Sequence, residues 1–220
     1  MENYLGQIAE RWDKVEHRIK EAELLSRAVH IPAINELRYA GRQLVDAMIK
    51  IHSSSVGEEE KRTLVQKHII VAEQYIRNAD HDISDALIDF IKNRIDSSLE
   101  KYGMATIVAH FPYIGEMRDL VQKADGLIAD SRRDRTKRDE NYSTIYNTCI
   151  IRLMELFHKF KEKEPSIIYD ALVVEKKYKA SRMVNHFYGV TTLVSAVLAI
   201  LFYIMPWSEL KVAVISKLGP

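Results

Sequence analysis

The sequence contains little cysteine, glycine and proline. A single cysteine, Cys149, in 220 residues excludes an intrachain disulfide framework and a cysteine metal cluster, and it fits a reducing cytoplasm. Eight glycines and five prolines leave few turn signals, and no alternating β-branched runs lie between them. Alanine, leucine, isoleucine and charged residues dominate instead, which is typical of long helices. We therefore expect an all-α fold.

Neither sign of charge is in excess, because 32 Lys and Arg face 31 Asp and Glu. Bulk charge therefore gives no argument for a nucleic acid or an acidic partner. The most charged stretch, residues 131–141, fits a solvated helix end or a phosphate contact. The sequence has no phosphate-binding glycine loop, no zinc-binding His-Glu-x-x-His helix and no nucleophile elbow. We expect no metal and no cofactor.

One stretch has no charged residue at all. Residues 187–207 read FYGVTTLVSAVLAILFYIMPW, and a helix of that length measures about 30 Å, the thickness of a bilayer's hydrocarbon core. Tyr188, Tyr203 and Trp207 fall where an interfacial aromatic belt would lie. We predict one transmembrane helix over residues 183–207, with a buried core helix as the alternative.

Cations flank this stretch unequally, and the positive-inside rule then predicts its orientation. Residues 1–182 would form a cytoplasmic domain, and residues 208–220 a short tail on the far side of the cell membrane. The cations before the stretch are Lys176, Lys177, Lys179 and Arg182, and those after it are Lys211 and Lys217.

Apolar residues at spacings of three and four predict helices along the rest of the chain. Residues 58–102 contain no glycine or proline and would form a helix of about 65 Å, so we expect an elongated bundle. We expect Pro165 to interrupt the chain before a helix that continues into the span. The other expected helices cover residues 3–29, 32–51, 142–163 and 166–185, with one more that follows Gly115 and ends near Arg138.

One polar cluster could carry chemistry. Arg77, His81 and Asp85 are spaced by four residues and share one face of a helix, so an imidazole would lie between a guanidinium and a carboxylate. Such a set can place a general acid or base beside an anion-stabilising group. A structural ladder of ion pairs is the alternative.

Arg77-Asn78, followed by a histidine on the same helix, resembles the motif of HEPN domains. These are helical RNases whose paired arginine and histidine cleave RNA at a dimer interface, with four to six residues between the two. Three residues separate Arg77 from His81. Arg152 and His158 form a second pair with five intervening residues, although Leu153 stands where a polar residue is usual.

Three functions are compatible with the sequence. The first is a membrane effector that self-associates and perturbs or perforates the bilayer, similar to membrane-anchored HEPN-like effectors of bacterial antiviral defence. Thr191, Thr192 and Ser195 would give its span a face for helix contact or pore lining. Its partners would be the lipid bilayer, further copies of itself, and a nucleotide signal or a protein. The second is a membrane-tethered RNase acting on RNA, and the third is a non-catalytic membrane scaffold.

Overall fold

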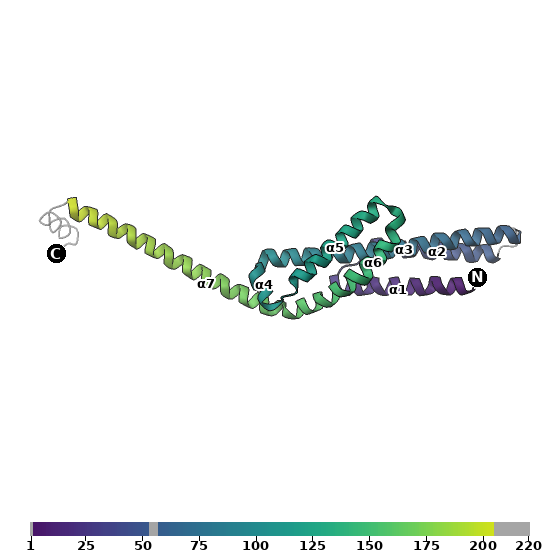
Figure 1. Ribbon diagram of the computed structural model, residues 1–220, viewed down its shortest axis with the longest axis horizontal. Helices are drawn as coiled ribbons and strands as arrows, with labels where there is room; N and C mark the ends of the chain where they lie inside the picture. The colour runs from purple at the N-terminus through teal and green to yellow at the C-terminus, as the bar shows by residue number, and fades with distance from the viewer. Residues whose placement is uncertain (1, 53–56, 205–220) are drawn as a thin grey trace, which may run out of the picture. The chain divides into compact units, whose positions relative to one another are not determined.

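A computed structural model of the protein describes residues 2–52 and 57–204 (Figure 1). All of the regular elements in these two ranges are helices, which confirms the all-α expectation. The chain divides at Pro165 into two compact units. The elements are α1 (Glu2–Ser26), α2 (Ile31–His52), α3 (Glu58–Tyr102), α4 (Met104–His110), α5 (Ile114–Arg133), η1 (Arg135–Lys137), α6 (Arg138–Thr144), η2 (Ile145–Ile150) and α7 (Ile151–Ile204).

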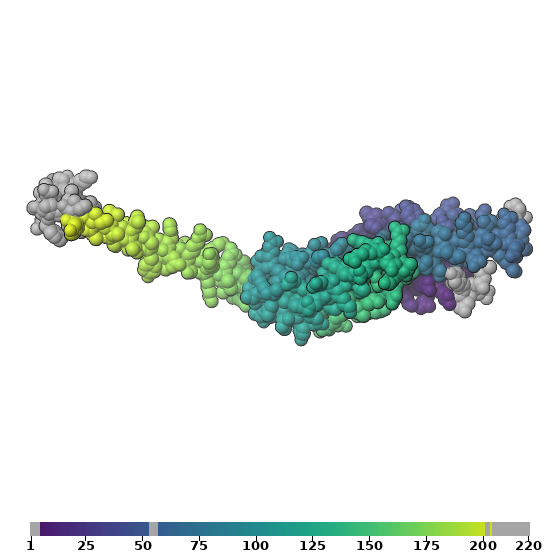
Figure 2. All heavy atoms as spheres, turned by 45° about the horizontal axis from the view of Figure 1, so that its top comes forward, coloured from purple at the N-terminus to yellow at the C-terminus, as the bar shows by residue number. Residues whose placement is uncertain are grey.

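Helix α3 is the element on which the first unit, up to Pro165, is built. It contacts α1, α2, α5, α6 and η2, and its second half meets the start of α7 through Phe90 and Arg94. In Figure 2 the α2–α3 hairpin extends beyond the part of the unit that α5 covers. Paired side chains show that α1 runs parallel to α3 and that α2 runs antiparallel to it. These pairs are Arg11–Glu73, Arg18–Asp80, Gln43–His68 and Asn78–Glu36.

The second half of α3 lies in a bundle with α5 and the first part of α7. Lys92 bonds to Asp125 of α5, and Phe90 packs edge to face against Phe157 of α7. The core here is fully buried and aromatic, because Phe157 lies near Phe160, whose ring meets Phe111 edge to face. Burial of such rings contributes on the order of 2–3 kcal/mol each.

Helix α7 differs from the expected pattern at its start and at Pro165. It begins after the π-helical turn η2, which sequence periodicity does not indicate. It also continues without a break through Pro165, so the expected interruption is wrong. Proline removes the donor for the carbonyl of Lys161, but both residues are exposed and water can satisfy that carbonyl.

Two other helices end earlier than the sequence suggests. The first helix stops at Ser26, because Arg27 adopts a left-handed φ of 56°. The helix expected to reach Arg138 stops at Arg133, where the Asp134 side chain accepts a bond from the Thr136 N–H and caps the next turn. The expected boundaries of residues 58–102 match α3.

The described part of the second unit, residues 166–204, is the remainder of α7. This helix contains an 18-residue apolar window, no part of which is buried. By length and composition α7 can therefore cross a membrane. Trp207 and the predicted tail, residues 208–220, lie outside the described residues.

Candidate functional site

The polar cluster predicted on α3 faces α6. One carboxylate, that of Asp139 on α6, lies 3.5 Å from Arg77 Nε and 3.5 Å from His81 Nε2. Arg77 also lies 4.0 Å from Glu73. The imidazole therefore has a carboxylate and a guanidinium beside it, but the carboxylate next to it belongs to α6 and not to Asp85.

The His81 side chain is enclosed and neutral. Its ring stacks on Tyr142 with centroids 4.0 Å apart, and only 5% of the residue is exposed. Burial, followed by the nearby Arg138 guanidinium, lowers the pKa of His81 to about 4. Its Nδ1 is buried without a hydrogen-bond partner among the described residues. The imidazole is therefore neutral at physiological pH and nearly closed to solvent.

Asp85 lies at the other end of the same network. It accepts a 2.7 Å hydrogen bond from the Tyr142 hydroxyl, and Arg132 of α5 lies 3.4 Å from its second oxygen. Burial and this bond to a carboxylate raise the pKa of the Tyr142 phenol. Tyr142 thus connects His81 and Asp85, and the network joins α3, α5 and α6.

Helix α1 contributes Arg18 to this region. Arg18 pairs with Asp80 of α3, and its guanidinium lies 3.3 Å from the centre of the Tyr146 ring in η2. A small cavity of about 160 Å³ separates these groups from His81 and Asp139. A wider hollow of about 520 Å³ lies next to it and also has Arg18 on its wall.

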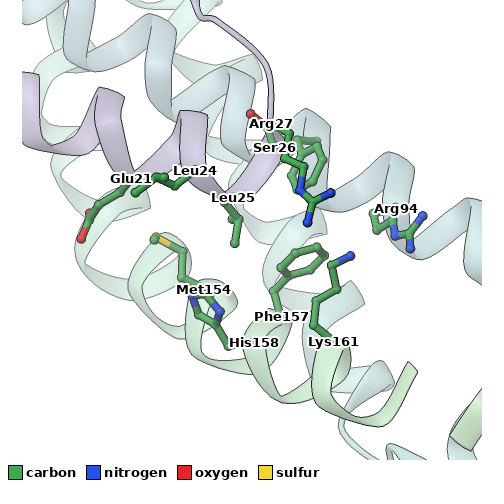
Figure 3. A pocket seen from close by; sticks show the side chains of 11 residues that line it. Glu21, Leu24, Leu25, Ser26, Arg27, Arg94, Met154, Phe157, His158 and Lys161 are labelled. Carbon is green, nitrogen blue, oxygen red and sulfur yellow. The ribbon is translucent and has the colours of Figure 1, made fainter. Parts of the chain in front are cut away.

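The second candidate pair is not brought together. Arg152 donates from Nε to Glu116 at 2.8 Å and from Nη1 to Glu155 at 2.9 Å. His158 is exposed and lines a different cavity, between α1, α3 and α7 (Figure 3). Six positions along a helix correspond to a rotation of about 240°, so the two side chains point to different sides of α7.

The hydroxyls predicted to lie in the span bond within their own helix. Thr191 donates to the carbonyl of Phe187 at 2.9 Å, and Thr192 donates to that of Tyr188 at 2.8 Å. Both residues and Ser195 are exposed. Since the threonine hydroxyls are already bonded, they do not require a polar partner on another helix.

Sequence reasoning missed Asp139 and Tyr142. Asp139 lies within the most charged stretch of the chain, residues 131–141, and Tyr142 follows it directly. A solvated helix end was the simpler interpretation of that stretch. A signal was present: an acidic and an aromatic residue three positions apart share a face of a helix. No group of three metal-ligating side chains occurs within the described ranges.

Comparison of the chain with models of protein families, with curated proteins and with solved structures finds no match. A function for this chain must therefore be argued from its own sequence and geometry. The cluster around His81 is a network of paired charges, with a neutral enclosed imidazole at its centre. This arrangement joins α1, α3, α5, α6 and η2 of the first unit.

Proposed function

We propose that the protein is a membrane-anchored helical effector that self-associates through α7 and perturbs or perforates the bilayer. The observation that carries this proposal is the apolar part of α7, long enough to cross a membrane and unburied throughout its 18-residue window. A core helix of a soluble domain would be covered on at least one side.

The cost of leaving this segment in water supports a lipid environment. Its large apolar side chains are roughly half to fully exposed, and full burial of each contributes about 1.5–3 kcal/mol. At half of that value the nine side chains together contribute about 7–13 kcal/mol, which is comparable to the whole stability of a domain. The side chains concerned are Phe187, Tyr188, Val190, Leu193, Val194, Val197, Leu198, Ile200 and Tyr203.

Small residues supply a surface for self-association. Thr191, Ser195 and Ala199 follow one another at intervals of four, the spacing that lets two membrane helices approach closely. A single span cannot enclose a channel, so the proposed pore is built by a homo-oligomer. Close packing, and not hydrogen bonding, drives this association, because the Thr191 hydroxyl is already bonded within the helix.

The cations of residues 176–182 support an orientation with the first unit in the cytoplasm. A cytoplasmic bundle can receive a trigger, for which a nucleotide signal or a protein is the proposed class. The resemblance to HEPN-like membrane effectors supports a role in antiviral defence. The alternative of a tethered RNase receives no support from His81, which is stacked under Tyr142 and held neutral.

Vesicle leakage tests the proposal. The full chain is reconstituted in liposomes loaded with a dye, and its oligomer mass is measured in native nanodiscs. We expect oligomers and dye release from the wild type. Ser195→Leu should reduce both, because a larger side chain separates the helices. Val197→Leu, on another side of α7, is the matched control and should change neither.

Two results would remove the proposal. One is a monomeric mass for the wild type at concentrations at which dye is released. The other is equal leakage from Ser195→Leu and Val197→Leu.

A further inference from the structure

The cavity that His158 lines opens within the first unit, between the end of α1, the second half of α3 and the start of α7 (Figure 3). Its volume is about 550 Å³, within the range of roughly 300–1,000 Å³ that is usual for small-molecule pockets. None of the residues discussed above as candidate catalytic groups lines it except His158. The cavity is therefore separate from the cluster around His81.

One part of the wall is aliphatic. Leu25 and Met154 line the cavity from opposite sides, and Leu24 is 81% exposed at its edge. In Figure 3 the side chains of Leu25 and Phe157 point toward the space between α1 and α7. Phe157 is fully buried, so it forms the floor without offering a free ring face. The accessible apolar surface suits an acyl chain better than a planar base.

The other part of the wall carries cations. Arg94 and Lys161 both pair with Glu164, the latter at 3.3 Å. Arg94 Nε is buried and has no acceptor among the described residues. That atom is closed to solvent, but the Arg94 side chain as a whole is 38% exposed and lines the cavity, so its guanidinium can meet an anion there. The carboxylate of Glu21 lies on the same wall, so the cations exceed the acids by one.

Arg27 provides the extra cation and has an unusual backbone. It follows the last residue of α1 with a φ of 56°, the one positive φ outside glycine in the described ranges. Helices that end this way usually carry glycine there, since other residues pay about 1–2 kcal/mol. Its guanidinium has no ion pair within the described residues and lines the cavity. An arginine that keeps a strained positive φ, where glycine would be unstrained, indicates a functional role for its side chain.

We propose that this cavity binds a small anionic amphiphile. Its phosphate or carboxylate contacts the guanidinium groups of Arg27 and Arg94, and its acyl chain lies against Leu24, Leu25 and Met154. The site belongs entirely to the first unit, so it does not depend on the membrane function proposed above.

Photolabelling of the full chain in phosphatidylcholine nanodiscs tests this site. The probe is a dodecyl phosphate analogue with a diazirine in its chain, and labelled peptides are mapped by mass spectrometry. We expect labels on the segments around Leu24 and Met154, displaced by dodecyl phosphate but not by dodecanol, inorganic phosphate or AMP. Labels on the apolar part of α7, from probe dissolved in the lipid, provide an internal standard.

Two substitutions of Arg27 separate binding from folding. Arg27→Gln removes the charge and should lower cavity labelling about tenfold, equivalent to about 1.4 kcal/mol. Arg27→Gly should lower labelling equally but raise the unfolding temperature, because glycine accepts the positive φ without strain. Arg62→Gln removes an exposed charge on α3 that does not line this cavity and should leave labelling unchanged.

Phosphatidylglycerol added to the nanodiscs distinguishes two sources of the amphiphile. Loss of cavity labelling would identify a bilayer lipid, and unchanged labelling would identify a free amphiphile. The proposal is overturned if the cavity of the wild type is not labelled or if Arg27→Gln labels as strongly as Arg62→Gln. Equal displacement by dodecanol, or stronger displacement by AMP, would overturn it as well.

Discussion

Leu193 lies in the middle of the uncovered apolar part of α7 and is 68% exposed. If this part of the helix crosses a bilayer, arginine at this position should oppose insertion. On the scale for insertion at a helix centre, leucine contributes about −0.5 kcal/mol and arginine about +2.5 to +3.5 kcal/mol. Leu193→Arg therefore costs about 3–4 kcal/mol, and adding Val197→Arg brings the total to about 6–8 kcal/mol.

Leu172 provides a matched control on the same helix. It is a leucine of similar exposure, 52%, but it lies before the cationic segment and outside the apolar stretch. Leu172→Arg changes the charge and the side chain in the same way and should leave membrane association intact. The pair of variants thus separates a membrane position from a general effect of a new arginine.

Extraction of membranes with alkaline carbonate measures the outcome. We expect the wild type and Leu172→Arg in the pellet, and Leu193→Arg with Val197→Arg largely in the supernatant. Release of the wild-type chain would refute the reasoning, because the apolar part of α7 would then be covered by protein and not by lipid. So would retention of the double variant together with the wild type.

Three further predictions concern the network around His81. Tyr142→Phe removes the hydrogen bond to Asp85 and should lower the free energy of unfolding by about 1–2 kcal/mol, or roughly 2–8 °C in a thermal melt. Tyr39→Phe, at an exposed ring, should change it by less than about 0.5 kcal/mol, and equal losses would contradict the assignment. The folded pKa of His81, about 4, lies below its unfolded value of about 6.5. The unfolded chain therefore binds more protons between these values, and the free energy of unfolding falls by about 2–4 kcal/mol as the pH drops from 6.5 to 4. In denaturant titrations, His81→Gln should reduce this dependence on pH. An unchanged dependence would show that other groups cause it. Finally, the purified chain should leave single-stranded RNA intact on a gel, and cleavage that Arg77→Ala abolishes would revive the RNase hypothesis.

The helical fold could be predicted from the sequence because its signals are local. Glu58, Glu59 and Glu60 after a linker begin α3, and Gly103 ends it with a positive φ of 77°. The apolar part of α7 was predicted in the same way, from a composition that needs no partner to be recognised. Pro165 misled the prediction, because a proline on an exposed face does not have to end a helix.

The candidate site could be predicted only in part. Helical spacing correctly puts Arg77 and His81 on a shared face, but it cannot show which segment covers that face. Asp139 and Tyr142 come from about sixty residues further along the chain, and only tertiary packing brings them to His81. Burial then determines the protonation state of His81, and burial is a property of the folded molecule.

The continuity of α7 through Pro165 means that one helix is packed in a bundle at its start and exposed from residue 174 to residue 200. Its amides up to about residue 165 belong to a packed bundle and should exchange with deuterium only when the bundle opens. From about residue 174 to residue 186 every side chain is exposed, so exchange there should be fast. Under the membrane proposal, slow exchange should return within residues 187–204. A protease that cuts within this interval would separate the packed bundle from the apolar part of α7.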